Sequence, residues 1–411
     1  MTDAPLRVLF LVDFRSPIAQ GWIRHLAGLG HTVRVVSTFP VDTDGEAFSV
    51  DVINLGFSHL VEIRANNSDP RESHPLKSWL ARAASSNVTR RVWHRTNSSL
   101  AGLEARRHTG TVDRFVRAFQ PDLIHAMRIP YEGVLAARLQ SRVPLLISTW
   151  GNDLTLWAER RRRMGEVTRR TLSAADALHC DCHRDLKLSE AYGFRPGRPR
   201  IVLPGGGGVD RSVFHPGPPD SDVLRALDIP LDRPLVVNPR GVREYVRNDE
   251  FLRAWVRVTR KRPDAFAVCV GMKGNPTLEH LHASLGIADS LRMLPSLAPN
   301  ALAELFRAAP VSVSPSVHDG TPNTLLEAMA SGCLPVAGRL NSVGEWVEEG
   351  VNGLFCDATD PDSIAEAIIR GLDDVALRRA AASRNASLIT ERAERHLVMN
   401  AAVDFYRSIV G

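Results

Sequence analysis

The chain lacks several features that define other classes of protein. Its 411 residues contain no run of about 18 apolar side chains, so we expect no transmembrane helix. The opening residues, MTDAPLRVLFLVDF, show neither a basic region nor a small-residue cleavage site, and they predict a first strand rather than a signal peptide. The five cysteines are scattered and form no framework of pairs, which is typical of a reducing compartment. We therefore expect a cytoplasmic protein.

Aromatic residues are also scarce, at 6% of the chain, and this bears on its positive charge. Residues 1–210 contain 29 Lys and Arg against 21 Asp and Glu, whereas the remainder contains 22 against 25. The densest basic cluster is Arg160–Arg163, with Arg169 and Arg170 close behind. Without an aromatic platform for base stacking we expect no nucleic-acid partner. A solvated helix face fits the cluster, and so does peripheral contact with an anionic membrane surface or a lipid phosphate.

Short apolar runs alternate with helical patterns along the chain. LRVLFLV and PLLIST in the first half, and PLVVNP and AFAVCVG in the second, are nearly continuous in apolar residues, as expected for strands buried on both faces. The segments between them, such as TVDRFVRAF and DEFLRAWVRVTRK, have helical periodicity. This alternation predicts an α/β fold with parallel sheets.

The alternation breaks once, at PGGGGVD, residues Pro204–Asp210. Glycine and proline at this density mark a connection between domains. The four glycines are not followed by the Lys and Ser or Thr of a phosphate-binding loop. We predict two Rossmann-like domains, residues 1–208 and 209–391, facing each other across a cleft.

The stretch SVHDGTPNTLLEAMASG, Ser316–Gly332, combines a loop with a helix start. Gly320 permits a tight bend after the strand VSVSPS, Thr321 is a candidate N-cap, and Pro322 suits the first helical position. The first-turn N–H groups of such a helix have no internal partners. The stretch therefore predicts an anion site, most naturally for phosphate.

Charged residues surround this anion site. Glu327 lies just over one helical turn in, where it suits a ribose, and Asp319 lies in the loop, where it suits a second polyhydroxy group. Arg240, Arg243 and Arg247 follow the first strand of the same domain and would grip an ionised diphosphate. Together these residues describe a site for a nucleoside diphosphate sugar. Magnesium between the two acids is an open alternative, but the phosphate site is explained without a metal.

Here the sequence resembles a known family, the retaining, nucleotide-sugar-dependent glycosyltransferases of the GT-B fold, family 4. Its E-x7-E element matches Asp319 and Glu327, and its Arg and Lys after the first C-domain strand match Arg240 and Arg247. Its PDxxH and HGxD elements resemble PDLIHA and WGNDLTL. The resemblance covers most of residues 120–370. It departs in four places: Asp319 stands for Glu, Arg247 for Lys and Met127 for a second His, and the loop DFRSP lacks a glycine pair.

The resemblance implies transfer of a sugar from a nucleoside diphosphate to an acceptor hydroxyl with retained anomeric configuration. Its implied catalytic residues are Asp319, Arg240, Arg247 and His125. The implied donor-binding residues are Glu327, the helix start Gly320, Thr321, Pro322, Asn323, Thr324 and Leu325, and Leu294 and Pro295 beside the base. Asp153, Asn152 and Arg15 would line the sugar or acceptor side.

The resemblance also implies partners and a last helix, near residues 392–411, that packs back onto the first domain. The partners are the nucleoside diphosphate sugar and an acceptor that is a glycan, a lipid-linked sugar or a small molecule, with no cofactor and no metal. Two other functions remain open from the sequence. One is a sugar-nucleotide epimerase of the same fold, and the other is a non-catalytic protein that binds surfaces through its basic residues.

Overall fold

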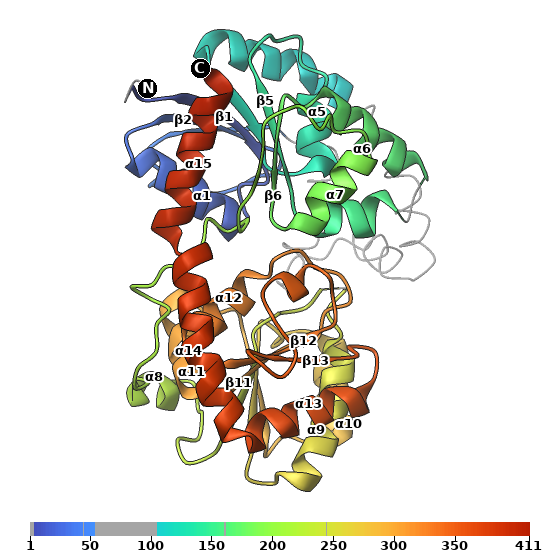
Figure 1. Ribbon diagram of the computed structural model, residues 1–411, viewed down its shortest axis with the longest axis vertical. Helices are drawn as coiled ribbons and strands as arrows, with labels where there is room; N and C mark the ends of the chain where they lie inside the picture. Colours follow the sequence, from blue (N-terminus) through green and yellow to red (C-terminus); the bar gives the residue numbers. More distant parts are fainter. Residues whose placement is uncertain (1–3, 44, 54–104, 160–161, 244) are drawn as a thin grey trace, which may run out of the picture. The chain divides into compact units, whose positions relative to one another are not determined.

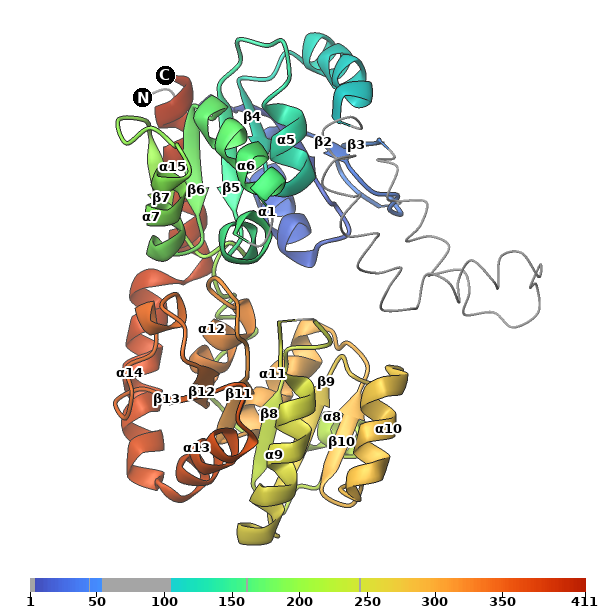
Figure 2. The ribbon, with the colours of Figure 1, turned by 90° about the vertical axis from the view of Figure 1, so that its right-hand side faces the viewer.

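The computed structural model describes residues 4–43, 45–53, 105–159, 162–243 and 245–411, and these form two compact units (Figures 1 and 2). The first unit contains the chain up to Asp181, Asp185–Val202 and Met399–Gly411. The second contains Cys182–Arg184 and Leu203–Val398. The main boundaries therefore follow Val202 and Val398, whereas the sequence placed them after residues 208 and 391.

In the described residues of the first unit, parallel strands form one sheet in the order β3-β2-β1-β4-β5-β6-β7. The strands are β1 (Arg7–Val12), β2 (Thr32–Ser37), β3 (Ser49–Val52), β4 (Leu123–Ala126), β5 (Leu145–Thr149), β6 (Ala177–Cys180) and β7 (Arg200–Val202). The named helices are α1 (Pro17–Gly28), η2 (Ile129–Gly133), α5 (Val134–Ala136), η3 (Asp153–Ala158), α6 (Arg162–Ala174), α7 (His183–Ala191) and α15 (Arg395–Val410), and residues 105–119 are also helical.

Side chains alternate between the two faces of this sheet. Leu9 and Ile124 pack in one apolar core with residues of α5, α6 and the helix 105–119. On the opposite face, the ring of His125 contacts Trp22 of α1 and Tyr406 of α15. The last helix is therefore a structural part of the first unit from Met399 onward.

The second unit has its own parallel sheet, in the order β10-β9-β8-β11-β12-β13. Its strands are β8 (Leu235–Asn238), β9 (Phe266–Val270), β10 (Leu291–Leu294), β11 (Val311–Ser314), β12 (Leu334–Gly338) and β13 (Leu354–Cys356). Its helices are α8 (Ser221–Ala226), α9 (Asn248–Lys261), α10 (Pro276–Leu285), α11 (Pro299–Ala308), α12 (Asn323–Ala330), η4 (Val343–Glu345), α13 (Pro361–Asp373) and α14 (Val375–Arg392).

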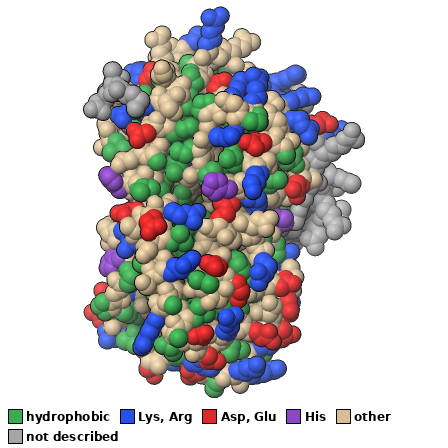
Figure 3. Space-filling model, in the orientation of Figure 1, with side chains coloured by type: hydrophobic (Ala, Val, Ile, Leu, Met, Phe, Trp, Pro, Cys, Tyr) green, Lys and Arg blue, Asp and Glu red, His purple; other side chains and the backbone are tan. Residues whose placement is uncertain are grey.

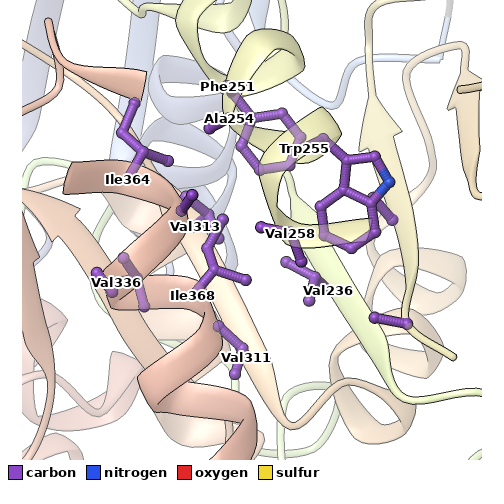
Figure 4. Packing of buried hydrophobic residues seen from close by; sticks show 14 of the residues in the cluster. Val236, Phe251, Ala254, Trp255, Val258, Val311, Val313, Val336, Ile364 and Ile368 are labelled. Carbon is purple, nitrogen blue, oxygen red and sulfur yellow. The ribbon is translucent and has the colours of Figure 1, made fainter. Parts of the chain in front are cut away.

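One core of the second unit lies between the sheet and helices α9 and α13 (Figure 4). Phe251 and Trp255 of α9 stack with their ring centroids 6.2 Å apart. They pack, with Ile364 and Ile368 of α13, against valines of the central strands. Fully burying one such side chain stabilises a fold by about 1.5–3 kcal/mol, so this core fixes the strands whose ends carry the charged loops.

The strand order shows where ligands of such sheets bind. In each unit the chain runs outward from the first strand in one direction and then returns to its other side, between β1 and β4 and between β8 and β11. Loops at this reversal diverge and leave a crevice at the carboxyl ends of the strands. Asp13, Arg15 and the segment after β4 follow the strands at this reversal in the first unit, and Arg240 and Asp319 follow them in the second.

None of the described helices has the length and apolar composition that a membrane crossing requires.

Candidate functional site

Helix α12 follows the carboxyl end of β11 and begins one residue later than the sequence predicts. Pro322, with φ −70° and ψ 119°, occupies the N-cap, and Asn323 is the first helical residue. The prediction that Thr321 caps the helix is wrong, because its hydroxyl instead accepts a hydrogen bond from the Trp346 indole at 3.2 Å. No side chain caps α12. Within the described residues, the backbone N–H groups of Asn323 and Thr324 have no acceptor.

The glycine run explains how close the chain passes to this helix start. A Cβ atom on Gly206 would lie 2.3 Å from Nδ2 of Asn323, so no larger residue fits without displacing the Asn323 side chain. Gly207 and Gly208, at φ +75° and +84°, complete a turn that side chains would strain. The glycines thus serve close packing beside α12.

Arg240 and Asp319 form an ion pair beside the first turn of α12. Arg240 Nη2 donates to Asp319 Oδ2, and the two side chains are only 9% and 11% exposed. Arg240 Nη1 donates to the Thr324 hydroxyl at 3.1 Å, while Asp319 Oδ1 accepts from the Gly320 N–H at 3.1 Å. The Nε atom of Arg240 is buried and has no partner in the described part of the chain.

Arg247 lies in a segment that pairs with the loop after β11. Its N–H donates to the carbonyl of Pro315 at 2.8 Å, and Val317 N–H donates to the carbonyl of Tyr245 at 2.9 Å. Its guanidinium forms no ion pair or hydrogen bond with another described residue, and its Nε atom is buried. Arg243 is exposed and donates to the backbone carbonyl of Arg240 at 2.6 Å. Arg247 is therefore a half-buried cation of this cluster with no counter-charge among the described residues.

Glu327 lies on α12 with its side chain partly buried. Desolvation raises the pKa of its carboxyl from 4.5 to about 7, against the opposing attraction of Arg395 and Arg240. Its carboxylate accepts no hydrogen bond from a described residue, so a ligand hydroxyl can donate to it.

Leu294 and Pro295, which we predicted beside the base, differ in exposure. Leu294 ends β10 with its side chain buried in the core, and its carbonyl accepts the N–H groups of Met272 and Lys273, each at 3.1 Å. Pro295 is exposed at the strand end. Of the pair, only Pro295 can present its side chain to a ligand.

His125 lies in the interior of the first unit, away from solvent. Its Nδ1 is 2.6 Å from the Tyr406 hydroxyl and its Nε2 is 2.7 Å from the Ser148 hydroxyl, which is also 2.8 Å from His179 Nδ1. The Trp22 indole donates to Tyr406 at 2.9 Å. Burial lowers the pKa of His125 well below 6.5. A neutral, fully buried ring with both nitrogens engaged favours a structural role over the catalytic one we expected.

Asp153 is also fully buried and holds the segment after β4. Its Oδ1 accepts from the Arg128 guanidinium at 2.9 Å, and its Oδ2 accepts from the N–H groups of Ile129 and Trp150, each at 3.2 Å. This arrangement favours support of the loop over the direct contact with sugar that we expected. The neighbouring Asn152 is partly exposed, and its buried Oδ1 has no partner among the described residues.

Arg15 faces the reversal point of the first sheet. Its guanidinium pairs with Asp13 at 2.8 Å and lies 3.9 Å above the ring of Phe39. Glu132, after β4, adds to its electrostatic attraction. The three loops after β1, β2 and β4 therefore converge here.

Sequence reasoning missed Glu132. It is 2% exposed, its Oε1 accepts from the Thr38 hydroxyl at 3.0 Å, and its Oε2 has no partner in the described residues. Burial raises the pKa of its carboxyl from 4.5 to about 7. The preceding residue, Tyr131, has a φ of +74°, which is strained for a side chain of this size. The only signal in the sequence is a charged residue inside RIPYEG, directly after a buried strand.

The basic cluster falls partly outside the described residues, which omit residues 160 and 161. Arg163, Arg169 and Arg170 are exposed on α6, and the Arg169 guanidinium lies 5.9 Å from the centre of the Tyr192 ring. In the space-filling view, Lys and Arg side chains gather over the part of the first unit that carries α5 and α6 (Figure 3).

Comparison with known proteins defines the class. Residues 16–205 match the family described as "Glycosyl transferase 4-like domain", and residues 222–387 match "Glycosyl transferases group 1". Sucrose-phosphate synthase from Thermosynechococcus elongatus is similar in structure, with a TM-score of 0.73, 17% identity and coverage of 98% of this chain and 99% of that chain. HepE from Anabaena in complex with UDP is also similar in structure, with a TM-score of 0.70 and 16% identity. The match covers 98% of this chain and 100% of that chain. The fold is therefore that of the GT-B glycosyltransferases.

Sequence relatives agree with this class. A protein of Acidothermus cellulolyticus named D-inositol 3-phosphate glycosyltransferase is 31% identical over 224 residues, which is 52% of this chain and 49% of the relative. A protein of the same name from Streptosporangium roseum is 32% identical over 207 residues, which is 48% of this chain and 47% of the relative. The chain spans about half the length of the curated relatives it matches. It belongs to the group 1 glycosyltransferases, with a 4-like domain in its N-terminal half.

Proposed function

We propose that the protein transfers a sugar from a nucleoside diphosphate sugar to an acceptor hydroxyl with retention of anomeric configuration. The observation that carries the proposal is the start of α12. There, two N–H groups that have no acceptor among the described residues lie beside the guanidinium of Arg240, and Arg247, which has no described counter-charge, follows in the adjoining loop. A helix start and arginines together form a site for a diphosphate. The structurally similar HepE is described in complexes with UDP and with UDP-glucose, which supports this choice of donor.

Glu327 extends the site beyond the phosphates. Its carboxylate accepts no hydrogen bond from a described residue, and it lies on the same helix just past the anion-binding turn. A ribose hydroxyl supplies such a donor, and a hydrogen bond to a charged group contributes about 1.5–3 kcal/mol. We place the nucleoside on this side of the diphosphate, toward the exposed Pro295.

In the transfer step, the acceptor oxygen forms a bond to the anomeric carbon while the bond from that carbon to the diphosphate oxygen breaks. The proton of the acceptor hydroxyl passes to the departing diphosphate, on the same face of the sugar, so the configuration is retained. The positive field of Arg247 and the helix start stabilises the charge that develops on the leaving group. This route requires no protein nucleophile and no metal.

The first unit is proposed to bind the acceptor. Its convergent loops supply Asp13 and Arg15, which can hold hydroxyl groups, and the buried Glu132 lies close to them. The exposed arginines of α6 suit an acceptor that carries phosphate or lies on an anionic surface. The relatives named for D-inositol 3-phosphate support a phosphorylated acceptor as one form of this proposal.

A thermal-shift screen against UDP, ADP and GDP and their sugars tests the proposal, with EDTA present in one arm and magnesium in the other. We expect one nucleotide to stabilise the protein equally in both arms; at 100 times its dissociation constant a ligand stabilises by about 2.7 kcal/mol. Failure of all nucleotides contradicts a nucleotide-sugar enzyme. Binding that needs magnesium contradicts the metal-free site. Isomerisation of the donor without an acceptor identifies an epimerase instead.

A further inference from the structure

Both carboxylate oxygens of Asp319 are already occupied within the second unit. Oδ2 is paired with Arg240 Nη2, and Oδ1 accepts from the N–H of Gly320. The residue is also fixed through its backbone, because the Ser342 hydroxyl donates to its carbonyl at 2.8 Å. Asp319 is only 8% exposed. It therefore has little surface with which to meet a sugar.

Arg240, by contrast, still has an unused donor. Nη2 is held by Asp319 and Nη1 by Thr324 on the first turn of α12, but the buried Nε–H has no acceptor among the described residues. A buried donor without an acceptor destabilises the fold, and an anion at the helix start would satisfy it. The two side-chain contacts thus use two of the five guanidinium N–H groups and orient the side chain, and the buried Nε–H is among the donors left for a ligand.

The length of the acid explains this arrangement. The sequence carries Asp at 319 where the resembling family has Glu, so the carboxylate ends one methylene nearer the backbone. At that reach it meets Arg240. The charges of the pair cancel, so the pair contributes geometry to the site and Arg247 contributes net charge.

We propose that Asp319 is a positioning residue, which fixes the Arg240 guanidinium against the first turn of α12 as a diphosphate ligand and does not bind the donor sugar. The proposal rests on the proposed function of the second unit. The proposal also predicts a direction for the change in anion affinity that differs from the direction expected from charge alone. Removing a negative charge near an anion site strengthens anion binding, whereas removing the support of Arg240 weakens it.

The experiment measures the affinity of the full chain for inorganic pyrophosphate and for the nucleoside diphosphate that the screen identifies, by titration calorimetry. We expect Asp319→Asn to weaken both ligands by about 10- to 100-fold, the scale of one charge-assisted hydrogen bond with its geometry. In the Arg240→Gln background the same substitution should have no further effect, because Asp319 acts through Arg240. Asp319→Asn alone leaves the buried Arg240 guanidinium without its counter-charge, and this can prevent the variant from folding well. The double variant lacks both charges, so its affinity can still be compared with that of Arg240→Gln.

Asp222→Asn is the matched control, because it removes one negative charge from the same unit at a side chain that is 89% exposed. It should leave both affinities unchanged. The proposal is overturned if Asp319→Asn binds pyrophosphate and the nucleoside diphosphate as tightly as the wild type but loses affinity for the nucleotide sugar. If the wild type binds neither pyrophosphate nor any nucleoside diphosphate, the proposed function fails as well, and this result is distinct from a failure at Asp319 alone.

Discussion

One buried polar network in the first unit differs from the charged loops of the second unit in how far its hydrogen bonds are made within the protein. In the first, Trp22, Tyr406, His125, Ser148 and His179 form a continuous chain of hydrogen bonds across one face of the sheet. In the second, the loops at the strand ends hold Arg240 and Arg247, each with a buried Nε atom that lacks a partner among the described residues. The side chains named in the first arrangement are linked to one another, whereas the second leaves two donors open, which the proposed diphosphate would fill.

Proton positions make the first network self-contained. The Trp22 N–H can only donate, so the Tyr406 hydroxyl oxygen accepts this bond and its O–H donates to His125 Nδ1. His125 then donates through Nε2 to Ser148, which donates to His179 Nδ1. Each hydroxyl both donates and accepts. The comparison teaches that a buried histidine with both ring nitrogens engaged within the protein fits a structural role, whereas Arg240 and Arg247 combine an open donor with a place beside the start of α12.

The largest expected effect breaks the first network. His125→Ala removes a fully buried ring and leaves the Tyr406 and Ser148 hydroxyls without it, so the free energy of unfolding should fall by about 3–5 kcal/mol. Nucleoside diphosphate affinity of the folded variant should not change. Urea denaturation followed by tryptophan fluorescence measures the first quantity and calorimetry the second. A stable variant that has lost nucleotide affinity would contradict the structural role.

The next effect concerns Glu132, a buried side chain of the first unit whose Oε2 has no partner among the described residues. Its pKa of about 7 in the folded state exceeds the ordinary value of 4.5, so the folded protein keeps a proton that the unfolded chain has released. The free energy of unfolding should therefore fall by up to about 3 kcal/mol as the pH rises from 4.5 to 7, and stay level above that. Glu132→Gln should remove this part of the pH dependence. A variant whose stability keeps the wild-type slope would refute the assignment.

Arg247→Ala tests whether the guanidinium without a described partner binds a ligand. Because its guanidinium pairs with no other described residue, its loss should change the free energy of unfolding by less than about 0.5 kcal/mol. Affinity for the nucleoside diphosphate should fall by about 10- to 100-fold, as expected for a charge-assisted contact of 1.5–3 kcal/mol. Arg243→Ala is the control, because that side chain is exposed and bonds to the backbone. Equal effects of the two substitutions would count against a specific role for Arg247.

Glu327→Gln should weaken nucleotide binding by about 1–3 kcal/mol. The wild type should also bind about tenfold more weakly at pH 6 than at pH 8, because binding uses the ionised carboxylate and its pKa is about 7. The variant should lose this pH dependence. Calorimetry at both pH values separates the two effects. Unchanged affinity in a folded variant would exclude the contact with ribose.

The smallest effect per residue is expected at the basic cluster of the first unit. Replacing Arg160–Arg163 by serine should weaken binding to anionic liposomes by about 1 kcal/mol for each residue near the surface, and salt should reduce the difference. Nucleotide affinity should remain unchanged. If the wild type does not bind such liposomes at low salt, the membrane-surface hypothesis fails and a soluble acceptor becomes the better hypothesis. If the variant loses nucleotide affinity, the cluster belongs with the donor site.

The sequence predicted the two parallel sheets because their central strands are apolar on both faces. It missed β3 and β7, whose side chains are largely exposed or half-buried and therefore form no apolar run. It predicted the helix start at α12 to within one residue, and the error came from Trp346, a distant residue that holds Thr321. Capping rules read only neighbours in the sequence, so they cannot anticipate such a competitor.

The charged residues of the second unit were found from motif spacing, but their mutual contacts were not. Spacing placed Asp319 and Arg240 near the same site, yet only the fold shows that they pair with each other. For His125 and Asp153, the motif identified residues that the structure buries. Glu132 was missed because desolvation, which raises the pKa of its carboxyl, depends on packing from three separate loops.

The bond between Trp22 and Tyr406 joins residues 384 positions apart, and this has a consequence for synthesis on the ribosome. The sheet of the first unit leaves the ribosome early, but its buried histidines and Trp22 lack their final partner until the last helix has been made. Every residue of the second unit is translated in the meantime. The first domain to be synthesised is therefore the last to be finished, and a chaperone that shields the α1 face of its sheet would act during that interval.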